Sequence, residues 1–325
     1  MNIVLSRLDR LGDLILSTPA IRTLRRTFPT ATLSLICSRY NHEAVAHNRD
    51  IDTLYIAAPE EAPSAIGRRF QGADLGIALA PCSADLRCIA ATRAARRIGY
   101  TYVRRWSMRA YARLLLTDCL ISDADPVFSE RDPNRPVQHE VEQLLQLAKT
   151  AGATELLPDL VLPLDPADRA TVADLPSDNI TIHLAPRWLQ AGSTEASFRS
   201  LCTELRGFGR PLVVTYAPET AAIAARLGAC ADVVLGDLSF GAWAASFERA
   251  ACVVTVDTGA THVASAMQRP TVVLFEHRNF ALNSREWAPW RVPAAAIRKP
   301  ADEHHDSLAA SRQELCQAVG RLLNT

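Results

Sequence analysis

The chain has 325 residues, of which 48% are hydrophobic and 22% are charged, and its formal net charge is zero. This length is enough for two domains with separate cores. The zero net charge argues against a general nucleic-acid-binding protein, and no run reaches the ~18 apolar residues that indicate a membrane span.

The first half of the chain alternates short apolar runs with stretches of helical periodicity. The apolar runs are rich in Val, Ile and Leu, and most are apolar throughout, which is typical of strands buried on both faces of a parallel sheet. Strands are predicted at 2–7, 32–38, 52–57, 75–80 and 96–100, and helices at 13–27 and 137–150.

A stretch rich in Pro and Asp at 157–178 interrupts this alternation and predicts a linker. Two successive α/β units predict two Rossmann-like, doubly wound domains, 1–165 and 166–325, that face a central cleft. The last helix is a candidate to pack back on the N-terminal domain. After the linker, strands are predicted at 179–186, 211–218, 232–235, 251–257, 271–276 and 294–298, and a final amphipathic helix at about 306–323.

The eight cysteines are scattered and form no C-x-x-C pair, which argues against a zinc site and a disulfide framework. Several lie in apolar runs, where a reduced thiol acts as a small hydrophobic side chain. The N-terminal apolar run is too short for a signal peptide, so a cytoplasmic location is expected. His304 and His305 have no second ligand cluster and are interpreted as surface residues, so no metal site is predicted.

The segment RLDRLGDLILSTPAIRTL places Asp13 where the first strand gives way to a helix. A carboxylate in the first turn of a helix is stabilised by about 0.3–1 kcal/mol, so one interpretation is a helix cap. The other is a general base that removes a proton from a substrate hydroxyl. Gly12 allows a ligand to approach the main chain closely.

A second informative segment is VVTVDTGATHVASAMQRPTVVLFE, residues 253–276. An apolar strand ends at Asp257, Thr258 and Gly259, and His262 lies in the first turn of the following helix. Main-chain N–H groups and a hydroxyl at such a helix start form a phosphate site. The alternative interpretation is an Asp/Thr cap beside a buried histidine.

Two groups of arginines in the N-terminal domain are candidates to bind an anionic acceptor. Arg7 and Arg10 either hold an anionic substrate or pair with Asp9. Arg104 and Arg105 belong to an arginine- and tyrosine-rich segment, 93–113, which is either a solvated helix face or a surface for phosphates of a lipid-linked acceptor or the inner leaflet. Each basic residue near an anionic membrane contributes about 1 kcal/mol.

The segments RLDRLGDLILSTPAIRTLRRTFP and DTGATHVASAMQRPTVVLF resemble the two signature regions of the ADP-heptose:lipopolysaccharide heptosyltransferase family. The resemblance extends to HEVEQLLQLAKTAG (139–152) and EWAPW (286–290). It implies a GT-B fold and an inverting glycosyltransferase. That enzyme moves a heptose or related sugar from a nucleotide diphosphate donor, ADP-heptose, to a lipopolysaccharide-core or other envelope glycan. The resemblance implies no obligatory metal or cofactor. Peripheral contact with the cytoplasmic face of the inner membrane is expected only if the segment 93–113 binds the phosphates of that leaflet.

The resemblance also implies roles for individual residues. Asp13 matches the proposed base, and Glu219 matches a glutamate that binds the donor ribose. The donor diphosphate is assigned to Asp257, Thr258, Gly259 and His262, with Arg187 as a candidate substitute cation, and the acceptor side to Arg7, Arg10, Gly12, Arg104 and Arg105.

Two departures from the family pattern bear on the donor. The family's lysine is missing from the segment that holds Ala191 and Ser193, and Arg and Lys are not interchangeable at such sites. Glu276 stands where a glycine is usual. The alternatives are therefore a catalytically weak or silent nucleotide-sugar-binding paralogue, or a transferase that uses a different nucleotide-sugar donor.

Overall fold

The computed structural model describes residues 1–190, 192–301 and 305–324. The chain forms two compact units, Met1–Pro163 and Leu164–Thr325, close to the division expected between residues 165 and 166. Ala191 and His304 lie outside the described residues.

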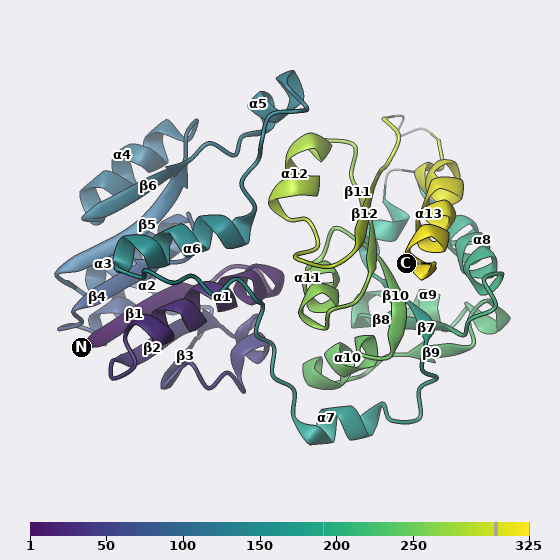
Figure 1. The fold of residues 1–325 in the computed structure, drawn as a ribbon, viewed down its shortest axis with the longest axis horizontal. Coiled ribbons are helices and arrows are strands. Elements are labelled where there is room, and N and C mark those ends of the chain that lie inside the picture. The colour runs from purple at the N-terminus through teal and green to yellow at the C-terminus, as the bar shows by residue number, and fades with distance from the viewer. Residues whose placement is uncertain (191, 302–304, 325) are drawn as a thin grey trace. The chain divides into compact units, whose positions relative to one another are not determined.

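The N-terminal unit contains a six-stranded parallel sheet in the order β3-β2-β1-β4-β5-β6 (Figure 1). Its central strands are almost wholly buried, as their apolar runs predict. The strands are β1 (Asn2–Arg7), β2 (Thr32–Ser38), β3 (Thr53–Ala57), β4 (Leu75–Ala78), β5 (Arg96–Tyr102) and β6 (Asp118–Ser122). The helices are α1 (Leu11–Thr27), α2 (Pro63–Arg68), α3 (Ser83–Ala91), α4 (Trp106–Leu115), α5 (Pro126–Arg131) and α6 (Glu140–Ala151), and a short 3₁₀ turn covers His42–Val45.

The C-terminal unit contains a second six-stranded parallel sheet, in the order β12-β11-β10-β7-β8-β9. The strands are β7 (Asn179–Leu184), β8 (Leu212–Tyr216), β9 (Val233–Leu235), β10 (Ala250–Val256), β11 (Thr271–Phe275) and β12 (Ala294–Arg298). The helices are α7 (Pro166–Thr171), α8 (Glu195–Arg206), α9 (Ala221–Ala224), α10 (Phe240–Phe247), α11 (Gly259–Ala266), α12 (Phe280–Glu286) and α13 (Ser307–Leu323). Short 3₁₀ turns cover Pro186–Leu189, Pro218–Thr220 and Gly228–Cys230.

Both sheets have the strand order of the doubly wound Rossmann fold when each is read from its own first strand. In this fold the strand order reverses at one point, and ligands bind beyond the carboxyl ends of the strands there. The reversal lies between β1 and β4 in the first unit and between β7 and β10 in the second. We therefore expect ligand-binding residues at these two places.

The segment predicted as a linker is ordered along much of its length. The main-chain N–H of Leu157 donates to the hydroxyl of Thr23 at 3.0 Å, and that of Val161 donates to the hydroxyl of Thr18 at 2.9 Å. Both threonines lie on α1, so the segment is fixed to the N-terminal unit until α7 begins the second one.

The final helix, α13, packs against α8, β12, β10 and β11 of its own unit. Its buried residues Leu308, Leu315, Ala318 and Val319 belong to the core of that unit. The apolar face of the helix, considered above for docking on the N-terminal domain, is thus buried within the C-terminal unit. No described helix combines the length and apolar character needed to cross a membrane.

Candidate active site

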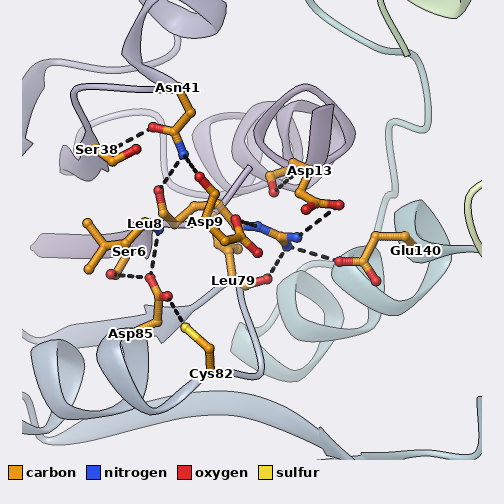
Figure 2. Close-up of polar contacts among 12 residues, drawn as sticks. Ser6, Leu8, Asp9, Asp13, Ser38, Asn41, Leu79, Cys82, Asp85 and Glu140 are labelled. Atoms are coloured by element: carbon orange, nitrogen blue, oxygen red, sulfur yellow. Dashed lines mark hydrogen bonds and ion pairs between the residues drawn. The ribbon is translucent and has the colours of Figure 1, made fainter. Parts of the chain in front are cut away.

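The carboxyl end of β1 carries a buried arginine surrounded by acidic side chains. The Arg7 side chain is 2% exposed; its Nε lies 2.8 Å from Asp9, and its Nη1 lies 2.9 Å from Glu140. Its Nη2 lies 3.6 Å from Asp13, and Nη1 also donates to the main-chain carbonyl of Leu79 after β4. Figure 2 shows Asp9, Asp13 and Glu140 converging on this point. A buried cation with this set of partners is held rigidly.

Glu140 reaches the cluster because α6 begins with it. His139 is the N-cap: its ring Nδ1 accepts a hydrogen bond from the N–H of Val141, and its own N–H donates to Glu142. The Tyr100 hydroxyl, from β5, donates to Glu140 at 2.8 Å. This reciprocal capping fixes where the helix starts and directs the Glu140 carboxylate at Arg7.

The loop between β1 and α1 is fixed from two sides. The Asn41 side-chain amide donates to the main-chain carbonyls of Arg7 at 3.0 Å and Asp9 at 3.3 Å (Figure 2). The Asp85 carboxylate accepts from the N–H of Leu8 at 3.1 Å, and burial raises the pKa of Asp85 to about 6. The loop that presents the acidic residues is therefore not free to adopt other shapes.

Asp13 is the third residue of α1, whose N-cap is Arg10. Its side chain is 17% exposed and faces Arg7. Within the described part of the chain no main-chain N–H donates to its carboxylate, so the geometry gives no support to a capping hydrogen bond. Burial raises the pKa of Asp13 from 3.8 to about 7, against the lowering effect of Arg7, and the charges of Asp9 and Glu140 add to the rise. A carboxyl with a pKa near neutrality is suited to proton transfer.

The second site lies where β7 and β10 end. Arg187, in the turn Pro186–Leu189 after β7, donates from Nη1 to the main-chain carbonyl of Asp257 at 2.6 Å and to its carboxylate at 3.0 Å. Asp257 directly follows β10. The two residues meet at the point where the strand order of this sheet reverses.

The helix that follows Asp257 starts at the same place. Thr258 is the N-cap of α11, Gly259 is its first residue, and the Thr258 hydroxyl donates to the carbonyl of Val256 at 3.2 Å. His262 is the fourth residue of the helix and is 5% exposed. The first N–H groups of a helix have no intrahelical acceptor, so this terminus beside Arg187 is suited to an anion.

The structure adds a residue that sequence reasoning missed. Lys299, immediately after β12, is 1% exposed; its Nζ donates to the Glu276 carboxylate at 2.6 Å and to the main-chain carbonyl of Arg187 at 2.9 Å. The segment around Arg187 thus does have a lysine beside it, supplied by a distant strand. The sequence offered one sign of this role, the position of Lys299 directly after a predicted strand, because the carboxyl ends of parallel strands share one edge of a sheet.

Arg10 and Gly12 lie beside Asp13 at the start of α1, and the charge of Arg10 lowers the pKa of Asp13. Arg10 is exposed and Gly12 is buried. The remaining candidates lie on other loops. Glu219 is exposed in the turn Pro218–Thr220 after β8. Arg104 and Arg105 are exposed between β5 and α4, with Arg104 3.5 Å from Asp125 and Arg105 above the Tyr102 ring. Among the described residues, no group of three or more His, Cys, Asp or Glu side chains could hold a metal ion.

Comparison with known proteins identifies relatives. The model of glycosyltransferase family 9 (heptosyltransferase) matches residues 127–316. A family 9 glycosyl transferase from Veillonella parvula is 16% identical with a TM-score of 0.78, covering 99% of this chain and 97% of that one. E. coli ADP-heptose LPS heptosyltransferase II is 18% identical with a TM-score of 0.74, covering 100% and 99%. E. coli heptosyltransferase WaaC with ADP-2-deoxy-2-fluoro heptose is 17% identical with a TM-score of 0.70, covering 98% and 99%. None of the curated proteins matches the chain in sequence.

Proposed function

Since the chain belongs to glycosyltransferase family 9, the heptosyltransferase family, and has the GT-B fold, we propose that it transfers a heptose or related sugar from an ADP-sugar donor to an envelope glycan. Asp13 is the general base of an inverting reaction. The observation that carries this proposal is the Asp13 carboxyl, whose pKa is raised to about 7 at the carboxyl edge of the first sheet. The proposed reaction requires no metal ion.

The donor diphosphate binds at the start of α11. The N–H groups there, together with Arg187, Thr258 and His262, meet its negative charge. A guanidinium offers several N–H donors. Among the described residues, the side chain of Arg187 donates through Nη1 alone, to Asp257. The Arg187 side chain is 34% exposed, so its other N–H groups can donate to phosphate oxygens. Glu219 receives the ribose. WaaC has been solved with an ADP-sugar analogue, which supports ADP as the nucleotide here.

In the proposed reaction an acceptor hydroxyl attacks the anomeric carbon of the donor sugar. Asp13 takes the hydroxyl proton as the new C–O bond forms, and the bond from that carbon to the phosphate oxygen breaks. The nucleoside diphosphate leaves with the bonding electron pair and is stabilised by the helix start and Arg187. A single displacement of this kind inverts the configuration at the anomeric carbon.

One of the two departures that favoured a silent paralogue, Glu276, is neutralised by a buried lysine. Glu276, which replaces the usual glycine, accepts a hydrogen bond from Lys299 and forms an ion pair with it at 2.6 Å. The donor therefore does not meet an isolated carboxylate at this position. The pairing supports an active transferase.

The proposed base predicts a pH dependence. Asp13 must be ionised to accept a proton, and burial raises its pKa to about 7. We expect kcat/KM to rise with pH along an acid limb whose midpoint lies near 7, and then to level off. A profile measured from about pH 5 to pH 9 checks this, and a rate that is flat below pH 6 would contradict the assignment.

The donor site predicts the effect of a substitution in α11. His262→Ala should weaken binding of ADP while the protein stays folded, because the buried imidazole lies within the first turns of the helix at the phosphate site. Isothermal titration with ADP, UDP and GDP measures both the loss and the base preference. Unchanged ADP affinity in the variant argues against this placement, and a clear preference for UDP argues against a heptose donor.

The acceptor side is assigned to Arg10, Gly12, Arg104 and Arg105. Arg7, considered above for the same task, is buried among carboxylates and instead positions Asp13. Trp106 and Leu114 are 74% and 82% exposed on α4, beside the arginines, which is the composition of a helix that lies on a membrane surface. We place the protein at the cytoplasmic face of the inner membrane, and its eight free cysteines suit that reducing compartment.

This assignment predicts salt-sensitive binding to acidic vesicles. Association with phosphatidylglycerol-containing liposomes should fall as salt rises, since screening weakens surface electrostatics. Exchanging Arg104 and Arg105 for Glu should reduce it further, whereas the same exchange at Arg68 and Arg69 of the α2 region should have little effect. Binding that is absent or independent of salt would leave the arginines as a solvated surface.

A further inference from the structure

The buried lysine of the C-terminal unit joins segments that are not neighbours in the sheet. Lys299 follows β12 at one edge, and Arg187 follows β7; β11 and β10 lie between these strands. The Lys299 amine nevertheless donates to the main-chain carbonyl of Arg187 at 2.9 Å. The main-chain N–H of Lys299 also donates to the carbonyl of Phe275, which fixes the base of the side chain.

Burial of this ammonium group requires a compensating charge. A charged group at 1% exposure is costly unless it is paired and hydrogen-bonded. Glu276 supplies the opposite charge at 2.6 Å, and the Arg187 carbonyl supplies a further acceptor. Glu276 is 32% exposed, so the pair is open to water on the carboxylate side only.

The contacts form one continuous series across the carboxyl edge of the sheet. Glu276 binds Lys299, Lys299 binds the main chain of Arg187, and the Arg187 guanidinium binds Asp257 at 2.6 and 3.0 Å. The series ends beside Thr258, the N-cap of α11. A movement of Lys299 would therefore be transmitted to the guanidinium that faces the phosphate site.

We propose that Lys299 is a positioning residue, which holds the turn Pro186–Leu189 so that Arg187 is directed at the diphosphate of the donor. The proposal rests on the function proposed above. Lys299 is too deeply buried to touch the donor itself, so it acts through Arg187. Glu276 is the counterion that allows a lysine at this place.

A double-mutant cycle tests whether Lys299 acts through Arg187. The variant K299M/E276Q removes both members of the ion pair and keeps side-chain volume, so no buried charge is left unpaired. It should weaken ADP binding about tenfold, the loss expected when a hydrogen bond that orients a charged group is removed. In a protein that already carries R187Q, the substitutions K299M/E276Q should cause no further loss of ADP affinity. In the parent background, kcat should change less than KM for the donor.

Arg206→Gln/Asp232→Asn, which removes an exposed ion pair at 2.7 Å in the same unit, is the matched control and should bind ADP like the parent protein. Unchanged ADP affinity in K299M/E276Q would overturn the proposal. Losses that add when R187Q is combined with it would also do so, since a positioning residue has no effect once the group it positions is gone.

Hydrogen exchange of the ligand-free protein separates this proposal from the proposed function. The peptide that contains residues 186–190 should exchange faster in K299M/E276Q than in the parent, while the peptide that contains β8 should be unchanged. Equal exchange at 186–190 overturns the positioning role even where ADP binds. Faster exchange in a protein that binds no ADP supports the positioning of the turn and contradicts the donor site instead.

Discussion

Asp13→Ala is expected to lower turnover by about 10²–10⁴-fold, the usual range for the loss of an acid–base group, and to leave donor affinity nearly unchanged. The acceptor hydroxyl must lose its proton as the new bond forms, and the substituted chain has no carboxylate at that position. The proposed donor contacts come from the other unit, at Arg187 and α11. Single-turnover rates together with ADP titration measure the two quantities separately.

Stability distinguishes this interpretation from a helix cap. The pKa of Asp13 is about 7 in the folded protein, above its ordinary 3.8, so the folded state binds more protons than the unfolded state between these values. The contribution of Asp13 to stability is therefore greatest at acid pH and is lost as pH rises towards 7. At pH 8 Asp13→Ala should not be destabilised, whereas a cap would cost about 0.5–2 kcal/mol.

Two further variants sharpen the comparison. Asp13→Asn keeps the shape of the side chain without its basicity and should be as slow as Asp13→Ala. Asp9→Asn changes another carboxylate on the same arginine, 29% exposed and 2.8 Å from Arg7, and should lose much less turnover. A fully active Asp13→Asn would remove Asp13 from the role of base.

The strands of both sheets were accessible from the sequence because most are buried on both faces and therefore read as continuous apolar runs. β6 (Asp118–Ser122) was not predicted because it lacks this burial. It is a half-exposed edge strand, and its sequence DCLIS begins with a charged residue. α1 starts at Leu11, two residues before the predicted helix, because Arg10 and not the Gly-Asp pair is its N-cap.

The candidate site was accessible where one strand end supplied the residues. Asp13, Asp257 and the start of α11 directly follow apolar strands, and the fold places such residues at the ligand-binding edge. Glu140 and Lys299 join the clusters only through tertiary structure, across large separations in sequence. Their partners could not be deduced from local patterns, although a lysine after a predicted strand was visible at 299.

Arg7→Met is expected to destabilise the protein by about 3–5 kcal/mol, the cost of breaking a buried ion pair by removing one partner. Arg7 is 2% exposed and lies against Glu140, which is 1% exposed, so water cannot replace the lost cation. Urea denaturation at pH 8 measures the change. Arg22→Met, which removes an arginine that is 43% exposed and paired with Asp50, is the matched control and should cost less than about 1 kcal/mol.

A second substitution identifies the source of the loss. Glu140→Gln in the Arg7→Met background removes the stranded carboxylate and should recover part of the stability, because the penalty comes from the uncompensated charge. Equal stabilities of the single and double variants would show that Arg7 contributes through packing. Turnover should not recover with stability: without Arg7 the pKa of Asp13 loses its main lowering influence and rises above about 7, so the proposed base is protonated at neutral pH. A double variant that regained stability and full activity at pH 7 would contradict the role of Arg7 as the residue that keeps Asp13 ionisable.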